Sequence, residues 1–115
     1  MNIQRFGGDG RVSTAVIHNG VLYLTSQKPD ISSCDIKEQA KSIFDRIDKL
    51  LAMYGTDKNN ILSATVYLKS ISDYAAFNGV WDEWVRDGFE PARTCVQASL
   101  PVEEYLVCVS LTAAV

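Results

Sequence analysis

The chain has 115 residues, of which 47% are hydrophobic and 22% are charged, and its formal net charge is −3. These values indicate one globular domain over residues 1–115, and the sequence contains no internal repeat, low-complexity tract or linker. The 11 Lys and Arg residues are scattered and form no basic stripe, which argues against a nucleic-acid-binding protein.

The N-terminal segment MNIQRFGGDG has no apolar stretch typical of an export signal, and no window approaches the ~18 apolar residues of a membrane span. The three cysteines, Cys34, Cys95 and Cys108, show no paired spacing, and there is a single His, so no metal site is expected. An odd number of cysteines without an export signal is typical of a reducing compartment. We therefore expect a cytoplasmic protein without contact to a membrane.

The first elements in chain order are a loop, a hairpin and a helix. The segment GGDG (7–10) lacks a preceding strand and is expected to lie in an N-terminal loop. Residues 15–26 form two β-prone runs joined by Asn19-Gly20, a dipeptide that favours a type I′ turn. Residues 34–55 carry one apolar stripe at helical spacing, with a capping box at Asp35 and Glu38 and a stop at Gly55.

A strand and a second helix follow. Residues 61–70 alternate, with Leu62, Ala64, Val66 and Leu68 predicted to face the helices and Ile61, Ser63, Thr65 and Tyr67 the other side. Residues 72–88 form an aromatic helix that begins at Ser72 or Asp73 and ends at Gly88. Its stripe, most simply a core face, consists of Tyr74, Phe77, Val80, Trp81 and Trp84.

The last two predicted strands cover residues 93–99 and 105–115. The short connection 100–104 predicts that they form an antiparallel hairpin. If the paired residue numbers sum to about 203, Arg93 lies near Ser110, and Cys95 lies near Cys108. In that arrangement the two thiols could be joined by oxidation.

The predicted order is therefore β-β-α-β-α-β-β, an α+β fold with one mixed sheet and two helices on one face. The opposite sheet face carries Ser, Thr, Tyr, Cys and small apolar residues, too much semi-apolar surface for a two-layer domain to leave in water. We expect this face to pack against copies of the same chain.

Arg93 stands at the start of a β-prone run, in the segment PARTCVQAS. Its planar fork of donors matches a carboxylate, so one Arg with few other charges indicates a site for small carboxylates. The alternative is an exposed ion pair between Arg93 and Glu90 or Asp87, which would contribute little. The residues alone leave both interpretations open.

Four segments together resemble the RidA/YjgF family, also called the L-PSP endoribonuclease-like family, nearly end to end. They are PARTCVQ (91–97), VLYLTSQKP (21–29), DYAAFNGVWDEW (73–84) and VCVSLTAAV (107–115). The resemblance implies a chorismate-mutase-like subunit, a homotrimer with sites in the clefts between subunits, and a cofactor-free hydrolase. The substrates would be reactive imines and enamines such as 2-aminoacrylate, and the products a 2-keto acid and ammonia.

The same resemblance implies roles for individual residues. Arg93 matches the arginine that holds the substrate carboxylate, Asn78 and Cys95 match further cleft residues, and Ser26 matches a serine at the end of the second strand. Ser110 joins the predicted neighbourhood of Arg93. The family's glutamate for proton transfer falls at Cys108, and a thiol is a weaker general acid or base for water near pH 7.

Further departures concern the rim: the family's site tyrosine falls near Ser13, and Gln27 and Lys28 replace the usual residues after Ser26. Three functions are compatible with these residues. The first is an imine deaminase, possessing weak or altered activity, in which Cys108, Ser110 or Ser26 assists a water. The second is a non-catalytic trimer that binds 2-keto acids. The third is a ribonuclease or translation inhibitor, which the acidic charge and the lack of a basic groove oppose.

Overall fold

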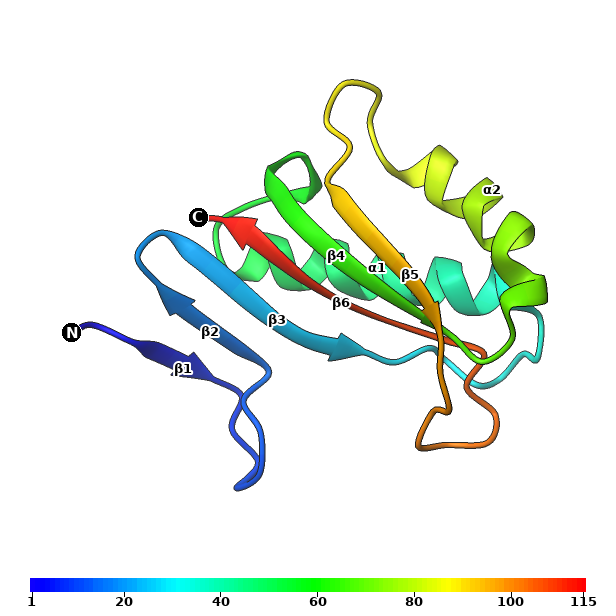
Figure 1. The fold of residues 1–115 in the computed structure, drawn as a ribbon. Helices are drawn as coiled ribbons and strands as arrows, with labels where there is room; N and C mark the ends of the chain where they lie inside the picture. Colours follow the sequence, from blue (N-terminus) through cyan, green and yellow to red (C-terminus); the bar gives the residue numbers. More distant parts are fainter.

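The computed structural model describes residues 1–115, and its centre is one mixed sheet of six strands (Figure 1). The strands lie in the order β1-β2-β3-β6-β4-β5. Only β4 and β5 are parallel, and all other neighbours are antiparallel. The strands are β1 (Gln4–Phe6), β2 (Ala15–His18), β3 (Val21–Gln27), β4 (Ile61–Leu68), β5 (Ala92–Gln97) and β6 (Val107–Ala114).

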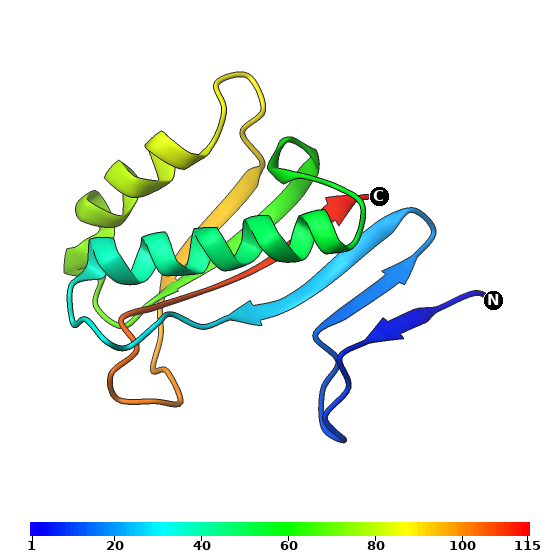
Figure 2. The ribbon, with the colours of Figure 1, turned by 180° about the vertical axis from the view of Figure 1, so that it is seen from behind.

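Both helices, α1 (Ile36–Met53) and α2 (Tyr74–Trp84), cover the same face of the sheet (Figure 2). Short 3-10 turns at Lys58–Asn60 and Ile71–Asp73 precede β4 and α2. The predicted α+β class and the one-sided placement of the helices are confirmed. The opposite face of the sheet has no helix over it, and we call it the open face.

The local signals of the first hairpin and of α1 produce the predicted structures. Asn19 and Gly20 have φ of 51° and 75°, as a type I′ turn requires. Asp35 accepts a hydrogen bond from the backbone N–H of Glu38 at 3.3 Å, and Gly55 at φ 82° follows the helix end. One core cluster contains the buried apolar residues of α1 and α2, namely Ile36, Ala40, Ile43, Phe44, Ile47, Leu51, Phe77, Val80 and Trp81.

Two strand details differ from the predictions. A register shift between Ile61 and Ser63 places Ile61 in the core and leaves Leu62 48% exposed, because a bulge interrupts the alternation of side chains. A further strand, β1, precedes the GGDG loop, where no strand was predicted. It pairs with β2, and its three residues are too few to produce a readable pattern.

The predicted hairpin of the last two strands is wrong. β6 runs between β3 and β4, while β5 lies at the sheet edge and pairs in parallel with β4. Helix α2 makes the crossover from β4 to β5, as parallel pairing requires. The chain segment 98–106 then passes the end of β4 before β6 begins, so a short connection in sequence does not join neighbouring strands.

Candidate functional site

Arg93 lies on the helix-covered face, near the sheet edge formed by β5. Its register partner on β4 is the core residue Ala64, which fixes that face. The guanidinium carbon lies 4.9 Å from the ring centre of Trp81, 5.8 Å from that of Tyr74 and 5.9 Å from that of Phe77. We call Arg93 and these three rings of α2 the aromatic cradle.

The cradle holds the guanidinium without neutralising its charge. Arg93 donates a long hydrogen bond of 3.4 Å to the Tyr74 hydroxyl, and neither of the two ion pairs of the chain includes it. An ion pair with Glu90 or Asp87 is therefore absent, and that alternative is wrong. Cation–π contact contributes about 0.5–2 kcal/mol per site and leaves the other donors of the fork unused. A half-buried Arg with free donors is suited to a bidentate anion.

Asn78 and Cys95 belong to the same side of the sheet as the cradle. Asn78 follows Tyr74 by four residues on α2, so the two share one face of the helix, and its side-chain Oδ1 is buried without a hydrogen-bond partner. Cys95 pairs with the core residue Val66 and packs against the core. Burial raises the pKa of the Cys95 thiol, and the charge of Arg93 only partly opposes this.

The other predicted site residues line a separate depression on the open face. This depression, which we call the open-face hollow, has a volume of about 470 Å³. It brings together Ser26, Cys108 and Ser110, as well as five residues that the sequence did not single out as a group. The full lining consists of Thr25, Ser26, Lys28, Tyr67, Leu100, Pro101, Cys108 and Ser110.

The thiol of Cys108 is neutral in this environment. The residue is 4% exposed, and burial raises the pKa of its thiol above the ordinary 9.0. A hydrogen bond with Ser26 and the charge of Lys28 act in the opposite direction without overcoming burial. Since no carboxylate lines the hollow, its only formal charge near pH 7 is the ammonium of Lys28.

The predicted contacts between the two groups are wrong. Arg93 and Cys95 pair with Ala64 and Val66 on the helix-covered face, whereas Cys108 and Ser110 pair with Tyr67 and Thr65 on the open face. Because β4 separates β5 from β6, their backbones are also two strand spacings apart, roughly 9–10 Å. Cys95 and Cys108 are thus too far apart, and too differently directed, for a disulfide.

The sequence did not predict that Tyr74 and Trp81 are partners of Arg93. It also did not predict that Tyr67 and Thr25 line the hollow. The stripe of α2 predicted Phe77, Val80 and Trp81 correctly as core residues, whereas Tyr74, predicted in the same stripe, is 43% exposed. The contact of Tyr74 and Trp81 with Arg93 depends on which strand lies beneath α2, and the periodicity of the sequence does not indicate that strand.

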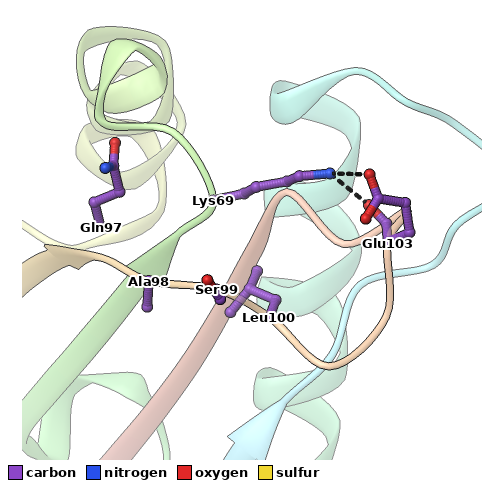
Figure 3. A pocket seen from close by; sticks show the side chains of 6 residues that line it. All are labelled: Lys69, Gln97, Ala98, Ser99, Leu100 and Glu103. Atoms are coloured by element: carbon purple, nitrogen blue, oxygen red, sulfur yellow. Dashed lines mark hydrogen bonds and ion pairs between the residues drawn. The ribbon is translucent and has the colours of Figure 1, made fainter.

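The connection after β5 forms one wall of the hollow and a second, more polar pocket of about 400 Å³. In this pocket the ammonium of Lys69 contacts the Glu103 carboxylate at 2.9 Å and its backbone carbonyl at 2.8 Å (Figure 3). The buried amide of Gln39 on α1 donates to the carbonyls of Ser33 and Glu104 and accepts from the N–H of Leu106. These bonds hold residues 103–106, the end of the connection that leads into β6.

None of the chain's helices combines the length and apolar content needed to cross a bilayer. Nowhere do three or more His, Cys, Asp or Glu side chains gather in a position to hold a metal ion.

Comparison with known proteins places this fold in a family. The sequence profile described as Endoribonuclease L-PSP matches residues 3–115. The chain belongs to this family. It is 40% identical to the RutC family protein YoaB of Escherichia coli K12, and the match covers 100% of both chains. A RutC family protein of Haemophilus ducreyi is 39% identical, over 98% of this chain and 97% of the relative.

A solved structure supports the same assignment. The crystal structure of NMB1025 from Neisseria meningitidis, a member of the YjgF protein family, superimposes with a TM-score of 0.94 at 41% identity. The superposition covers 99% of this chain and 95% of that one. The resemblance to the RidA/YjgF family that was drawn from four segments is thus confirmed over the whole chain.

Proposed function

We propose that this protein hydrolyses reactive imines and enamines derived from amino acids, releasing a 2-keto acid and ammonia. The observation that carries the proposal is the aromatic cradle, in which Arg93 has a fixed position and no anionic partner. The carboxylate of such a substrate would accept two parallel hydrogen bonds from the guanidinium. The resemblance to the RidA/YjgF family, to which the chain belongs, implies the same activity and places Asn78 and Ser26 in the site.

The complete site lies between copies of the chain in this proposal. The cradle and the open-face hollow cannot meet within one subunit, because the sheet separates them. The open face also exposes apolar side chains, including Tyr23 at 49% and Val96 at 39%. A homotrimer, which the family resemblance implies, would cover this face and bring the hollow of one copy to the cradle of the next.

The reaction requires addition of water to the C=N carbon. The attacking oxygen loses a proton, the nitrogen gains one, and the resulting carbinolamine expels ammonia to leave the C=O bond. Arg93 would orient the substrate through its carboxylate, and the hydroxyls of Ser26 and Ser110 would hold the water. The Cys108 thiol, protonated because burial raises its pKa, would serve as a hydrogen-bonding group and not as a ready base.

The test is a rate measurement with imines generated in situ by an amino-acid oxidase and detected by semicarbazide trapping. The wild type should accelerate loss of the imine, and Arg93→Ala should reduce kcat/KM by about 100-fold, since a charge-assisted bidentate contact is lost. The matched control is Arg86→Ala, which removes an exposed Arg stacked on Phe89. A wild-type rate equal to that of buffer would refute the proposal.

The location of the site has its own test. Co-assembly of Arg93→Ala with Thr25→Trp, which would fill the hollow, should restore activity in clefts that combine the intact half of each variant. Size-exclusion chromatography verifies that both variants assemble like the wild type. Equal inactivity of the mixed and the separate assemblies would place the site within a single subunit.

A second candidate is a trimer that binds 2-keto acids without turnover. It is favoured by one observation, the absence of any carboxylate in the hollow beside the neutral Cys108. In that case pyruvate and 2-oxobutyrate would raise the Tm of the wild type but not of Arg93→Ala. Imine hydrolysis by the wild type would exclude this candidate.

A further inference from the structure

The open-face hollow contains a cation that the reaction described so far does not use. The Lys28 side chain lines the hollow together with hydroxyl groups of Thr25, Ser26, Tyr67 and Ser110. The two ion pairs of the chain are Glu38–Lys41 and Lys69–Glu103, so the ammonium of Lys28 has no carboxylate within contact distance. The hollow thus presents one unpaired positive charge and several hydroxyl hydrogens.

No acidic group forms an ion pair with Lys28. Asp9 lies within the electrostatic range of Lys28, but its Oδ1 already accepts hydrogen bonds from the N–H groups of Arg11 and Val12, at 2.8 Å each. The thiol of Cys108 is neutral because burial raises its pKa. The resemblance to the family places a glutamate at this position, and a carboxylate there would have neutralised Lys28.

The backbone that carries Lys28 is fixed, although the side chain itself is exposed. Arg46 on α1 donates to the Lys28 carbonyl at 2.8 Å, and the N–H of Asp30 donates to the Ser42 hydroxyl at 2.9 Å. Pro29 between them is buried. The loop is therefore docked on α1, and the stem of Lys28 starts from a defined point at the rim of the hollow.

From these features we propose that the hollow is a subsite for a second carboxylate, so that the preferred substrates are imines of acidic amino acids. The inference rests on the proposed function: Arg93 of one copy binds the α-carboxylate, and Lys28 of the next copy binds the distal carboxylate. The hydroxyl groups of Thr25 and Tyr67, which also line the hollow, supply additional donors to the same group. A neutral thiol at position 108 is compatible with an anion, whereas a carboxylate would repel it.

The test compares imines generated from aspartate or glutamate with the imine generated from alanine. The wild type should show a kcat/KM for the dicarboxylic imines at least about tenfold above that for the alanine imine. Lys28→Met keeps the length of the side chain, removes the charge and should reduce this ratio about tenfold. Lys49→Met, an exposed lysine on the outer side of α1, should leave the ratio as in the wild type.

A binding measurement separates this inference from the proposed function. Calorimetry with 2-oxoglutarate and 2-oxobutyrate should show tighter binding of the former, and Lys28→Met should remove the difference. If no imine is hydrolysed but this difference is present, the activity is wrong and the second-carboxylate subsite stands. If imines are hydrolysed without preference, and Lys28→Met changes neither the ratio nor the binding, the subsite is wrong and the activity stands.

Discussion

The aromatic cradle and the open-face hollow lie on opposite faces of one sheet and differ in construction. The cradle is part of the core: Phe77 is 0% exposed, Trp81 is 6% exposed, and both rings pack on Phe44 of α1. The hollow is walled by a connection that hydrogen bonds hold in place, and it is lined by hydroxyl groups, a thiol and Lys28. Under the proposed function, binding of the α-carboxylate would depend on packing, while chemistry and selectivity would depend on side chains that the core does not require.

The largest expected effect is that of Phe77→Ala on stability. Removing this fully buried ring leaves a cavity between α1, α2 and the sheet, at a cost of about 3–5 kcal/mol in the free energy of unfolding. Because Phe77 is one of the rings around Arg93, the variant should also lose the proposed imine hydrolysis. Urea denaturation measures the loss, and Leu100→Ala in the hollow is the matched control, with an expected change below about 1 kcal/mol. Equal losses for both variants would contradict the difference in construction.

Gln39→Leu should loosen the connection that walls the open-face hollow and leave the structure of the aromatic cradle unchanged. The substitution leaves the carbonyls of Ser33 and Glu104 and the N–H of Leu106 without their partners, which costs about 2–4 kcal/mol in stability. Hydrogen exchange should then accelerate in residues 98–106 and stay slow in α2. Uniform acceleration over the whole chain would show that Gln39 supports the core in general.

The rates of imine hydrolysis of Arg93→Lys, in the aromatic cradle, and Cys108→Ser, in the open-face hollow, compare the two regions. Lysine keeps the charge of Arg93 but loses the planar fork and the stacking on Trp81, so kcat/KM should fall about 10- to 100-fold. Serine keeps a small hydrogen-bonding group at position 108, and the rate should change less than about threefold. A larger loss for Cys108→Ser than for Arg93→Lys would assign proton transfer to the thiol.

The smallest expected effect is the response of the cysteines to pH. Burial raises the pKa of the Cys95 and Cys108 thiols above 9.0, so the folded state retains these protons more strongly than the unfolded state. Their contribution to stability is complete below about pH 9 and is lost as the pH rises through the folded-state pKa. Alkylation should follow exposure, with Cys34 first, Cys95 second and Cys108 last. Early alkylation of Cys108 at pH 7 would contradict its burial.

The amino-acid sequence predicted those elements whose signals are local. The stripe of α1, its cap at Asp35, the Asn19-Gly20 turn and the alternation within β6 all depend on neighbours within a few residues. It also determined that Arg93 stands at the start of a strand, and its motifs indicated the family. The bulge that places Ile61 in the core and Leu62 outside it was not predicted. An alternating sequence gives no local signal for the position of one extra residue.

The order of the strands, and with it the neighbours of every candidate site residue, depends on long-range pairing that the sequence pattern does not reveal. The insertion of β6 between β3 and β4 is a choice among pairings that are distant in sequence, and the periodicity of a strand is the same beside any partner. That choice places Arg93 under the rings of α2 and Cys108 beside Lys28, on opposite faces of the sheet. The aromatic cradle and the open-face hollow are therefore separated by a strand order that no local pattern in the sequence indicates.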